Sequence, residues 1–308
     1  MNDLKAALTE ALEIGRAATK RGRVVTYIPE LASANPERLG VAIALPSGER
    51  IVAGDVDPPF TLQSVAKTLS LTLALALFGE DAVFERVGME PTGDPFNTLI
   101  SLEEAESKPL NPMINAGAIA VCSLLVDELG PEEAWERIFK AASELCAPEP
   151  VRLDQKALAS ERSTAHRNRA LAHLLKELKL MRGEPEVALE LYLSLCSLEV
   201  SCTGLAQMAL FYAHPAALAK AVGVPADVVR TVNTFLVTCG MYNASGEFAI
   251  RVGIPAKSGV SGAIMAVVPG SMGIGVIGPA LDPRGNSVGG VELLTSLSRR
   301  LSLSIFAK

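Results

Sequence analysis

The chain has 308 residues, of which 49% are hydrophobic and 20% are charged, and its formal net charge is −6 at pH 7. This length and apolar content can bury a large core, and they predict one large domain or two closely packed ones. The acidic balance and the lack of a basic run with interleaved aromatic residues disfavour nucleic acid as a partner.

The N-terminal segment lacks the basic start and apolar centre of a signal peptide, and the longest apolar run, 69–78, is far shorter than a bilayer span. We therefore expect a cytoplasmic protein without membrane contact. The five cysteines include no Cys-x-x-Cys pair, which predicts buried and reduced thiols. The three histidines show no metal-binding spacing, so we expect no metal.

The first elements are an amphipathic helix over 3–20, an irregular segment at 27–31 and a β-hairpin over 40–54. Tyr27 lies in the irregular segment, where Pro29 excludes a regular helix. Taken alone, this tyrosine is more often a core residue than a ligand contact. Two strands are thus expected before the next helix.

The middle of the chain is helical in pattern, and its expected helices are 64–78, 112–129, 131–145, 166–180, 185–198 and 203–213. Strand patterns return at 248–254, 263–268 and 272–277, and a final helix is expected over about 287–303.

Strands at both ends of the chain, with helices between them, predict a single catalytic domain over 1–308 built from two lobes. The expected α/β lobe is discontinuous and comprises about 1–63 and 225–308, and the helical lobe comprises about 64–224. A cleft between the two lobes is the expected pocket.

The segment 60–67 is predicted to open a buried helix, with Thr61 as its cap. Ser64 and Lys67 are three residues apart, so the hydroxyl and the amine would lie on one helix face within hydrogen-bonding reach. A serine needs a neighbouring base to become a good nucleophile, and a lysine is such a base only when neutral. Burial and a nearby second cation would both lower the lysine pKa.

The segment 255–262 contains Lys-Ser-Gly at a predicted strand edge. Together with an upstream Ser-x-x-Lys, this is the pairing of acyl-serine enzymes of the penicillin-recognising type. Lys257 would be the second cation, and the amides of Val260 and Ser64 could form an oxyanion hole. Either motif alone also fits a chance occurrence or a turn with a solvated lysine.

Three more polar residues, Asn115, Glu161 and Asn168, lie in helical or loop segments where they could meet a substrate. Asn115 stands in an apolar helix start, just after Asn111, which we expect to cap it. Glu161 and Asn168 are seven apart, and they suit an ammonium and a carboxylate, respectively. On the surface, Glu161 would simply be solvated.

Two tyrosines could shuttle a proton if a neighbouring lysine lowered their pKa, namely Tyr192 and Tyr242. The glycine pattern at 273–278 matches a dinucleotide motif by letter, but we discount it because the segment has a strand pattern and no helix follows it.

Five motifs occur in one order along the chain, at 27–32, 63–67, 111–119, 166–168 and 255–260. With this series, from about residue 27 to 269, the chain resembles the serine-dependent glutaminase family. The resemblance implies a β-lactamase/DD-peptidase-like α/β fold, with an antiparallel sheet flanked by helices and an inserted all-helical lobe. It also implies hydrolysis of L-glutamine to L-glutamate and ammonia without a cofactor, and a homo-oligomer, either dimer or tetramer.

The same resemblance assigns catalytic roles. Ser64 would be the nucleophile, Lys67 its base and Lys257 a second catalytic lysine, and we favour Tyr242 over Tyr192 for proton transfer to the leaving ammonia. The implied substrate contacts are Tyr27, Gln63, Ser64, Asn115, Glu161, Asn168, Tyr192, Tyr242 and the Val260 backbone.

Within that set, Glu161 would face the substrate ammonium, and the asparagines with a tyrosine would hold its α-carboxylate. The sequence departs from the usual family pattern at 164–166 and 260–263, which bears on loop shape near the pocket.

Two alternatives remain open at this stage. A β-lactamase or peptidase could use the same dyad, although the chain has no export signal and no Ser-x-Asn or Tyr-x-Asn tripeptide between Ser64 and Lys257. A non-catalytic amino-acid sensor could share the scaffold, although a sensor needs no nucleophile beside two lysines.

Overall fold

The computed structural model describes residues 2–94 and 108–307. Its centre is an antiparallel sheet in the order β2-β1-β8-β7-β6. The strands are β1 (Gly40–Ala44), β2 (Arg50–Gly54), β6 (Ala256–Ser258), β7 (Ala263–Val268) and β8 (Met272–Ile277). The N-terminal hairpin therefore pairs with the C-terminal strands through β1 and β8, as the sequence pattern predicts.

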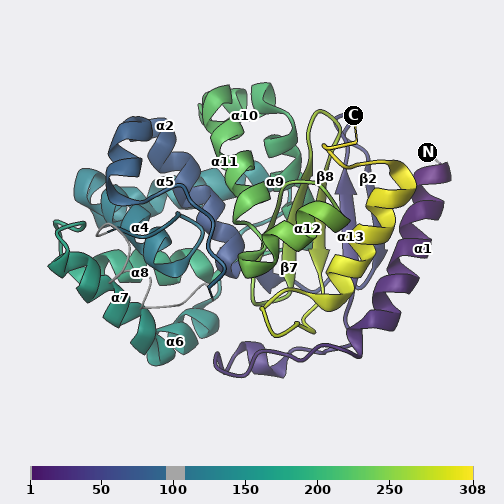
Figure 1. Cartoon of the computed structure of the whole chain (residues 1–308), viewed down its shortest axis with the longest axis horizontal. Coiled ribbons are helices and arrows are strands. Elements are labelled where there is room, and N and C mark those ends of the chain that lie inside the picture. Colours follow the sequence, from purple (N-terminus) through teal and green to yellow (C-terminus); the bar gives the residue numbers. More distant parts are fainter. Residues whose placement is uncertain (1, 95–107, 308) are drawn as a thin grey trace.

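Helices cover both faces of this sheet (Figure 1). The two terminal helices, α1 (Asn2–Thr19) and α13 (Val288–Leu301), pack side by side on one face, and α9 (Cys202–Ala213) lies on the other. Alternate residues of β7 divide between the faces: Ile264 and Ala266 join the core under α1 and α13, whereas Met265 joins the core of the helical side.

The glycines of β8 have a packing role. A Cβ atom at Gly273 or Gly275 would lie within 2.7 Å of the α9 backbone, so only glycine allows this close approach. The Cys202 thiol at the start of α9 also donates to the Gly275 carbonyl at 3.1 Å. The glycine-rich segment 273–278 therefore forms a strand, as its pattern indicated, and its glycines allow α9 to pack closely against it.

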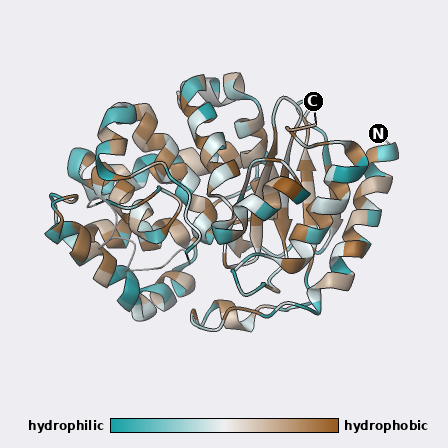
Figure 2. Ribbon diagram, viewed as in Figure 1, coloured by the Kyte–Doolittle hydropathy of each residue, from teal (hydrophilic) through white to brown (hydrophobic). Residues whose placement is uncertain are grey.

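The other half of the molecule is helical and encloses a large apolar core. Hydrophobic residues concentrate on the strands and the inward helix faces (Figure 2). The remaining helices are α2 (Lys67–Arg86), α4 (Asn115–Leu129), α5 (Pro131–Cys146), α6 (Gln155–Thr164), α7 (His166–Glu177), α8 (Pro185–Cys196), α10 (Pro215–Val222), α11 (Ala226–Thr238) and α12 (Ser245–Arg251). Of these, α12 packs in the core of the sheet half. Short 3-10 turns are η1 (Leu31–Ser33), η2 (Gln63–Ala66) and η3 (Tyr242–Ala244).

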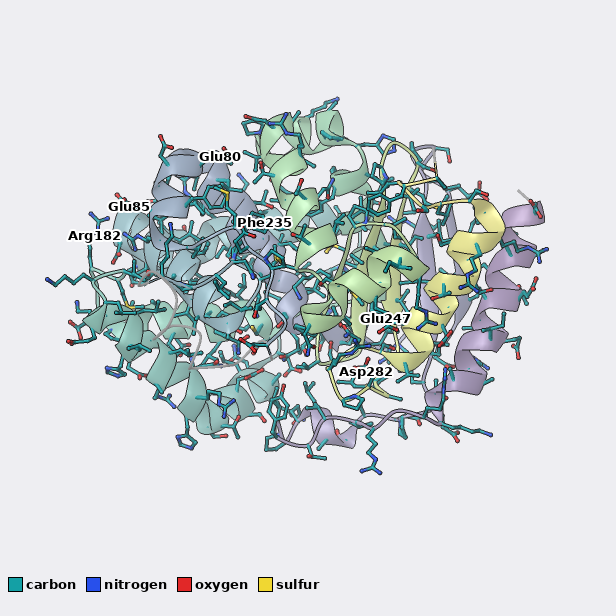
Figure 3. All side chains as sticks on the ribbon, in the orientation of Figure 1. Glu80, Glu85, Arg182, Phe235, Glu247 and Asp282 are labelled. Carbon is teal, nitrogen blue, oxygen red and sulfur yellow. The ribbon has the colours of Figure 1, made fainter. Side chains whose placement is uncertain are left out.

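Helix α11 joins the two halves. Its Phe235 ring lies 5.9 Å from Phe84 of α2, and Thr231 donates to Glu80 at 2.9 Å. Figure 3 shows Phe235 and Glu80 on these neighbouring helices. No helix among the described residues is long and apolar enough to cross a membrane. The division into lobes at 64–224 stays a prediction, and its residues 95–107 lie outside the described part.

The predicted strand at 248–254 is wrong, because these residues fall mainly in helix α12. Their apolar residues alternate as in a strand, but Phe248 and Val252 are four apart and both enter the core, whereas Ile250 between them is 88% exposed. Helical spacing thus decides which apolar side chains are buried. Helices α6, α10 and α11 were also not predicted.

The start of the serine helix differs from the prediction as well. A third strand, β3 (Phe60–Thr61), precedes it and pairs with β5 (Leu198–Val200), which also pairs with β4 (Arg152–Leu153). Thr61 is not the cap, since its hydroxyl accepts from Gln63 Nε2 at 3.3 Å. The first turn is 3-10 and the α-helix begins at Lys67.

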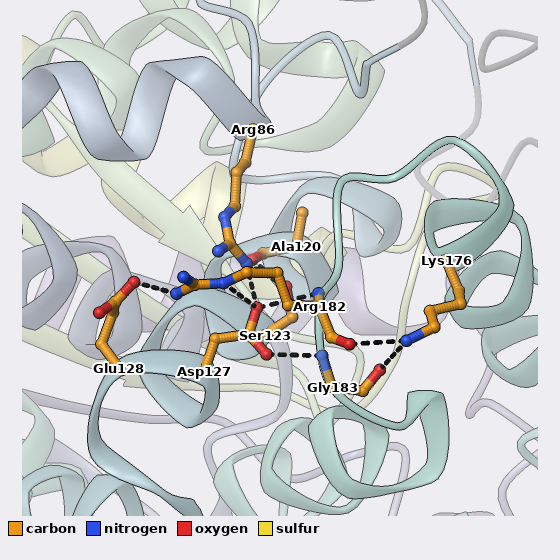
Figure 4. Close-up of polar contacts among 8 residues, drawn as sticks. All are labelled: Arg86, Ala120, Ser123, Asp127, Glu128, Lys176, Arg182 and Gly183. Atoms are coloured by element: carbon orange, nitrogen blue, oxygen red, sulfur yellow. Dashed lines mark hydrogen bonds and ion pairs between the residues drawn. The ribbon is translucent and has the colours of Figure 1, made fainter.

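A buried ion pair ties the helical half together (Figure 4). Asp127 of α4, with a side chain only 3% exposed, accepts from Arg86 of α2 at 2.7 Å. It also accepts from the backbone amides of Arg182 and Gly183. Burial alone would raise the pKa of Asp127, but these hydrogen bonds outweigh it and hold the pKa below its ordinary value.

We predict that Asp127→Asn lowers the free energy of unfolding by about 3 kcal/mol, because it leaves a buried guanidinium without its counter-ion. Urea unfolding measures this. Glu133→Gln, in the exposed pair with Arg137, is the control and should cost less than about 1 kcal/mol. Since the pKa of Asp127 is depressed in the folded state, the difference in unfolding free energy between wild type and D127N should persist above pH ~4. It should shrink at lower pH, where Asp127 becomes protonated. Equal losses in the two variants would contradict the role of this ion pair.

Candidate active site

Ser64 lies in the 3-10 turn between β3 and α2 and is 6% exposed. Two features fix the backbone just before Ser64. The Leu62 backbone amide donates to the Leu198 carbonyl at 2.8 Å, and Gln63 has φ +49°. A non-glycine residue in this left-handed region costs about 1–3 kcal/mol and persists only where surrounding contacts enforce it. The strained turn therefore fixes the direction of the serine side chain.

Lys67, one turn further on, is fully buried. Its amine donates to Asn115 Oδ1 at 2.7 Å and to the Met113 carbonyl at 3.1 Å, and it lies 5.8 Å from the centre of the Tyr192 ring. Burial lowers the pKa of Lys67 to about 8, with the neighbouring thiols of Cys196 and Cys122 acting in the opposite direction. This amine is therefore partly neutral near pH 7.

Asn115 and Asn168 form a pair beside the lysine. Asn115 Nδ2 donates to Asn168 Oδ1 at 2.9 Å, which joins the start of α4 to α7. Asn115 thus bonds to both Lys67 and Asn168. The expected cap Asn111 does accept from two backbone amides, those of Met113 and Ile114, but it does so before the helix, which begins at Asn115 rather than at 112.

Lys257 on β6 is the second buried lysine. Its amine donates to the carbonyls of Gly240 and Ser258 at 3.1 and 2.8 Å, and it lies 4.5 Å from the centre of the Tyr242 ring. Burial first, and the charge of Lys67 second, hold the pKa of Lys257 well below its ordinary value. The sequence predicts the converse effect, of Lys257 on Lys67, but it is burial that lowers the pKa of Lys67.

Tyr242 connects the serine to the Lys-Ser-Gly strand. Its hydroxyl donates to the Ser258 carbonyl at 3.1 Å, and a hydrogen bond joins its side chain to that of Ser64. Burial raises the pKa of Tyr242, and the hydrogen bond with Ser64 only partly opposes it. The condition set in the sequence analysis, a tyrosine pKa lowered by a lysine, is therefore not met at Tyr242.

Glu161 of α6 is 7% exposed and hydrogen-bonded to the Gln63 side chain. Burial raises the pKa of this carboxyl, and the bond with Gln63 opposes the shift. A buried carboxylate favours a cationic partner. Glu161 and Gln63 therefore form one wall of the site next to Ser64.

The end of β6 lies against the serine turn. A Cβ atom at Gly259 would lie 2.6 Å from the Leu62 carbonyl, so a larger residue could not sit there. The Val260 amide follows, and among the described residues it donates to no acceptor. It is available to a bound ligand near Ser64.

The remaining two predicted contacts differ in burial. Tyr192 of α8 is buried, and a hydrogen bond joins it to the Cys196 thiol. Tyr27 is 55% exposed, and a cleft of about 720 Å³ lies between it and Val260. This places Tyr27 at the rim of the site, on the segment whose Ile28 packs against Tyr242.

The sequence analysis missed three groups here. The carbonyls of Met113, Gly240 and Ser258 position the two lysines and Tyr242, but every residue carries a carbonyl, so no sequence signal marks them. Cys196 lies close enough to act on the pKa of both lysines. It was recognised only as a buried thiol. In the described part of the chain, no cluster of three or more His, Cys, Asp or Glu side chains could hold a metal ion.

Comparison with known proteins identifies the family of the chain. The family model described as Glutaminase matches residues 22–306. A glutaminase of Geobacillus thermodenitrificans (strain NG80-2) is 47% identical, and the alignment covers 98% of each chain. The solved structure of the probable glutaminase ybaS has a TM-score of 0.93 at 36% identity and covers 99% of both chains.

A third relative, the Bacillus subtilis glutaminase YbgJ, was solved as a covalent complex with 5-oxo-L-norleucine formed by reaction with 6-diazo-5-oxo-L-norleucine. It is 39% identical with a TM-score of 0.86, over 97% of this chain and 98% of that one. The β-lactamase-like α/β fold implied by the sequence motifs is confirmed by these structures. The chain belongs to the glutaminase family.

Proposed function

We propose that this glutaminase hydrolyses L-glutamine to L-glutamate and ammonia through an acyl-enzyme on Ser64. The observation that carries the proposal is the buried cluster of one serine, one tyrosine and two lysines, in which Lys67 has a pKa of about 8. Such a cluster supplies a nucleophile and a base that is neutral in part of the molecules at neutral pH.

Substrate binding would use the two polar walls. The substrate ammonium would pair with the Glu161 carboxylate, whose burial strengthens that attraction. The α-carboxylate would accept from the amides of Asn115 and Asn168, with Tyr192 closing that side and Tyr27 covering the rim. Gln63 would hold Glu161 in place through their hydrogen bond.

Acylation would begin when the Ser64 oxygen attacks the side-chain amide carbon while its proton passes to the neutral amine of Lys67. The negative charge that develops on the substrate oxygen would be stabilised by the amides of Ser64 and Val260. Lys257 would keep the Lys-Ser-Gly strand and the Tyr242 turn in place, since its amine donates to the Gly240 and Ser258 carbonyls.

Collapse of this intermediate requires a proton on the departing nitrogen. Tyr242 is hydrogen-bonded to Ser64 and keeps its proton because its pKa is raised, so it suits a proton donor to the leaving ammonia. Lys67 would then return a proton to the tyrosine. Water would attack the glutamyl ester, and the products would be L-glutamate and the restored Ser64 hydroxyl.

We further propose that the chain is a homo-oligomer, as the family resemblance implies. From the sequence pattern, we also propose that it is cytoplasmic and that its two lobes divide at about residues 64 and 224. Light scattering on the purified protein tests the oligomer, with a single monomeric mass as the contrary result.

We predict that Ser64→Ala reduces ammonia release from L-glutamine at least about a thousandfold, because the acyl-enzyme cannot form. A coupled ammonia assay measures this, with L-asparagine as the control substrate and circular dichroism as the control for folding. Equal release by wild type and S64A would contradict the nucleophile. Turnover of nitrocefin in place of glutamine would favour the β-lactamase alternative.

We predict that kcat/KM for glutamine rises with pH and levels off above an apparent pKa near 8, because Lys67 must lose its proton to act as base. Burial lowers its pKa, and the thiols of Cys196 and Cys122 act in the opposite direction. Rates between pH 6 and 9 measure the profile. Lys67→Arg, which keeps the charge, should be inactive throughout, and a flat wild-type profile would contradict the assignment.

A further inference from the structure

The turn that carries Tyr242 is held in an unfavourable conformation. Tyr242 has φ +54°, which lies in the left-handed backbone region that residues other than glycine rarely adopt. The turn must hold this conformation for the hydroxyl to meet both Ser64 and the Ser258 carbonyl. Other contacts must therefore enforce it.

Some of these contacts come from the adjoining residues. The Ser245 hydroxyl donates to the Tyr242 carbonyl at 2.8 Å and accepts from the Met241 amide at 3.1 Å. On the other side, Lys257 donates to the Gly240 carbonyl. These bonds set the shape of the turn, but Ser245 belongs to the same segment and would move with it.

A second contact from outside the turn, besides that of Lys257, comes from Asn286. Asn286, in the loop between β8 and α13, is 1% exposed, and its Nδ2 donates to the Met241 carbonyl at 3.3 Å. If the side-chain amide of Asn286 were flipped, its Oδ1 would face the Met241 carbonyl oxygen, and two acceptors would meet without a proton. Met241 directly precedes Tyr242, so Asn286 holds the peptide group that joins Met241 to Tyr242.

The loop that supplies Asn286 is fastened to α12. The backbone amide of Asn286 donates to Asp282 Oδ1 at 3.0 Å. The Arg284 side chain forms ion pairs with both Asp282 and Glu247. Figure 3 labels Glu247 on α12 and Asp282 on the loop beneath it. The asparagine thus has a fixed anchor relative to the helix that follows the turn.

The stability of the fold alone does not explain an asparagine at position 286. Its Oδ1 is buried and has no partner among the described residues, and a buried unpaired acceptor is unfavourable. The Met241 carbonyl also accepts from the Ala244 amide at 3.0 Å, so it would keep a partner without Asn286. An apolar residue of similar size would avoid the unpaired oxygen.

We propose that Asn286 is a positioning residue for Tyr242: its amide holds the Met241 carbonyl so that the tyrosine hydroxyl stays on Ser64. This proposal rests on the proton-transfer role given to Tyr242 above. A cavity of about 230 Å³, lined by Met241, Phe248 and Asn286 among others, adjoins the bond and gives the turn room to shift when it is lost.

The test is Asn286→Leu, which keeps the size of the side chain and removes the amide. We expect kcat to fall roughly tenfold or more, because small misplacements of a catalytic group have effects of this order. KM should change little, and the melting temperature should not fall. Asn286→Ala carries the same expectation for kcat and serves if the leucine variant does not fold.

The matched control is Asn233→Leu. Asn233 of α11 has the same arrangement, with Nδ2 donating to the Tyr212 carbonyl at 3.0 Å and a buried Oδ1 without a partner in the described chain. Its carbonyl partner lies in α9 and not beside Tyr242. N233L should therefore keep the wild-type kcat, and an equal loss of kcat in both variants would overturn the proposal.

A double-mutant cycle separates this proposal from the proposed function. Tyr242→Phe should lower kcat by about a hundredfold, and in that background N286L should have almost no further effect. Loss in Y242F with wild-type kcat in N286L, or the same factor for N286L in both backgrounds, would overturn the positioning role alone. Full activity of Y242F would overturn the role of Tyr242 and this proposal with it.

Discussion

The structure depends on the burial of two lysines in one small site. Lys67 and Lys257 are both fully buried, and each amine is held by carbonyl oxygens that belong to other segments. Desolvation disfavours the charged form of both, and the charge of Lys67 further disfavours that of Lys257. This burial provides the partly neutral amine that the proposed mechanism uses as its base. Every segment that touches these amines must be placed accurately, since an unsatisfied buried amine is costly.

The fold meets this requirement by bringing distant segments to one point. The serine turn enters from β3, the Asn115–Asn168 pair from α4 and α7, and Lys257 from β6. The rigid sheet and the packed helical core hold these segments, while strained turns at Gln63 and Tyr242 aim the reacting groups. Strain at these two positions is consistent with a site whose geometry is enforced by its surroundings.

The sequence predicted the residues of the buried polar cluster better than the local structure. Ser64, Lys67 and Lys257 could be found because their motifs combine residue types rarely needed together, and the strands at 263–268 and 272–277 alternate clearly. Helix α12 was mistaken for a strand because only tertiary packing decides that Ile250 faces solvent. The Asn115 bond to Lys67 and the Asn286 bond to Met241 join residues 48 and 45 positions apart, and no local pattern marks such pairs.

The central claim is that Ser64 is the nucleophile which forms the covalent intermediate. The most direct measurement is peptide mass spectrometry after reaction with 6-diazo-5-oxo-L-norleucine, the reagent that gave the covalent complex of the Bacillus subtilis relative. We predict one adduct on the peptide that contains Ser64, none in S64A, and slow formation in K67R. An adduct on another residue, or an adduct that persists in S64A, would contradict the account.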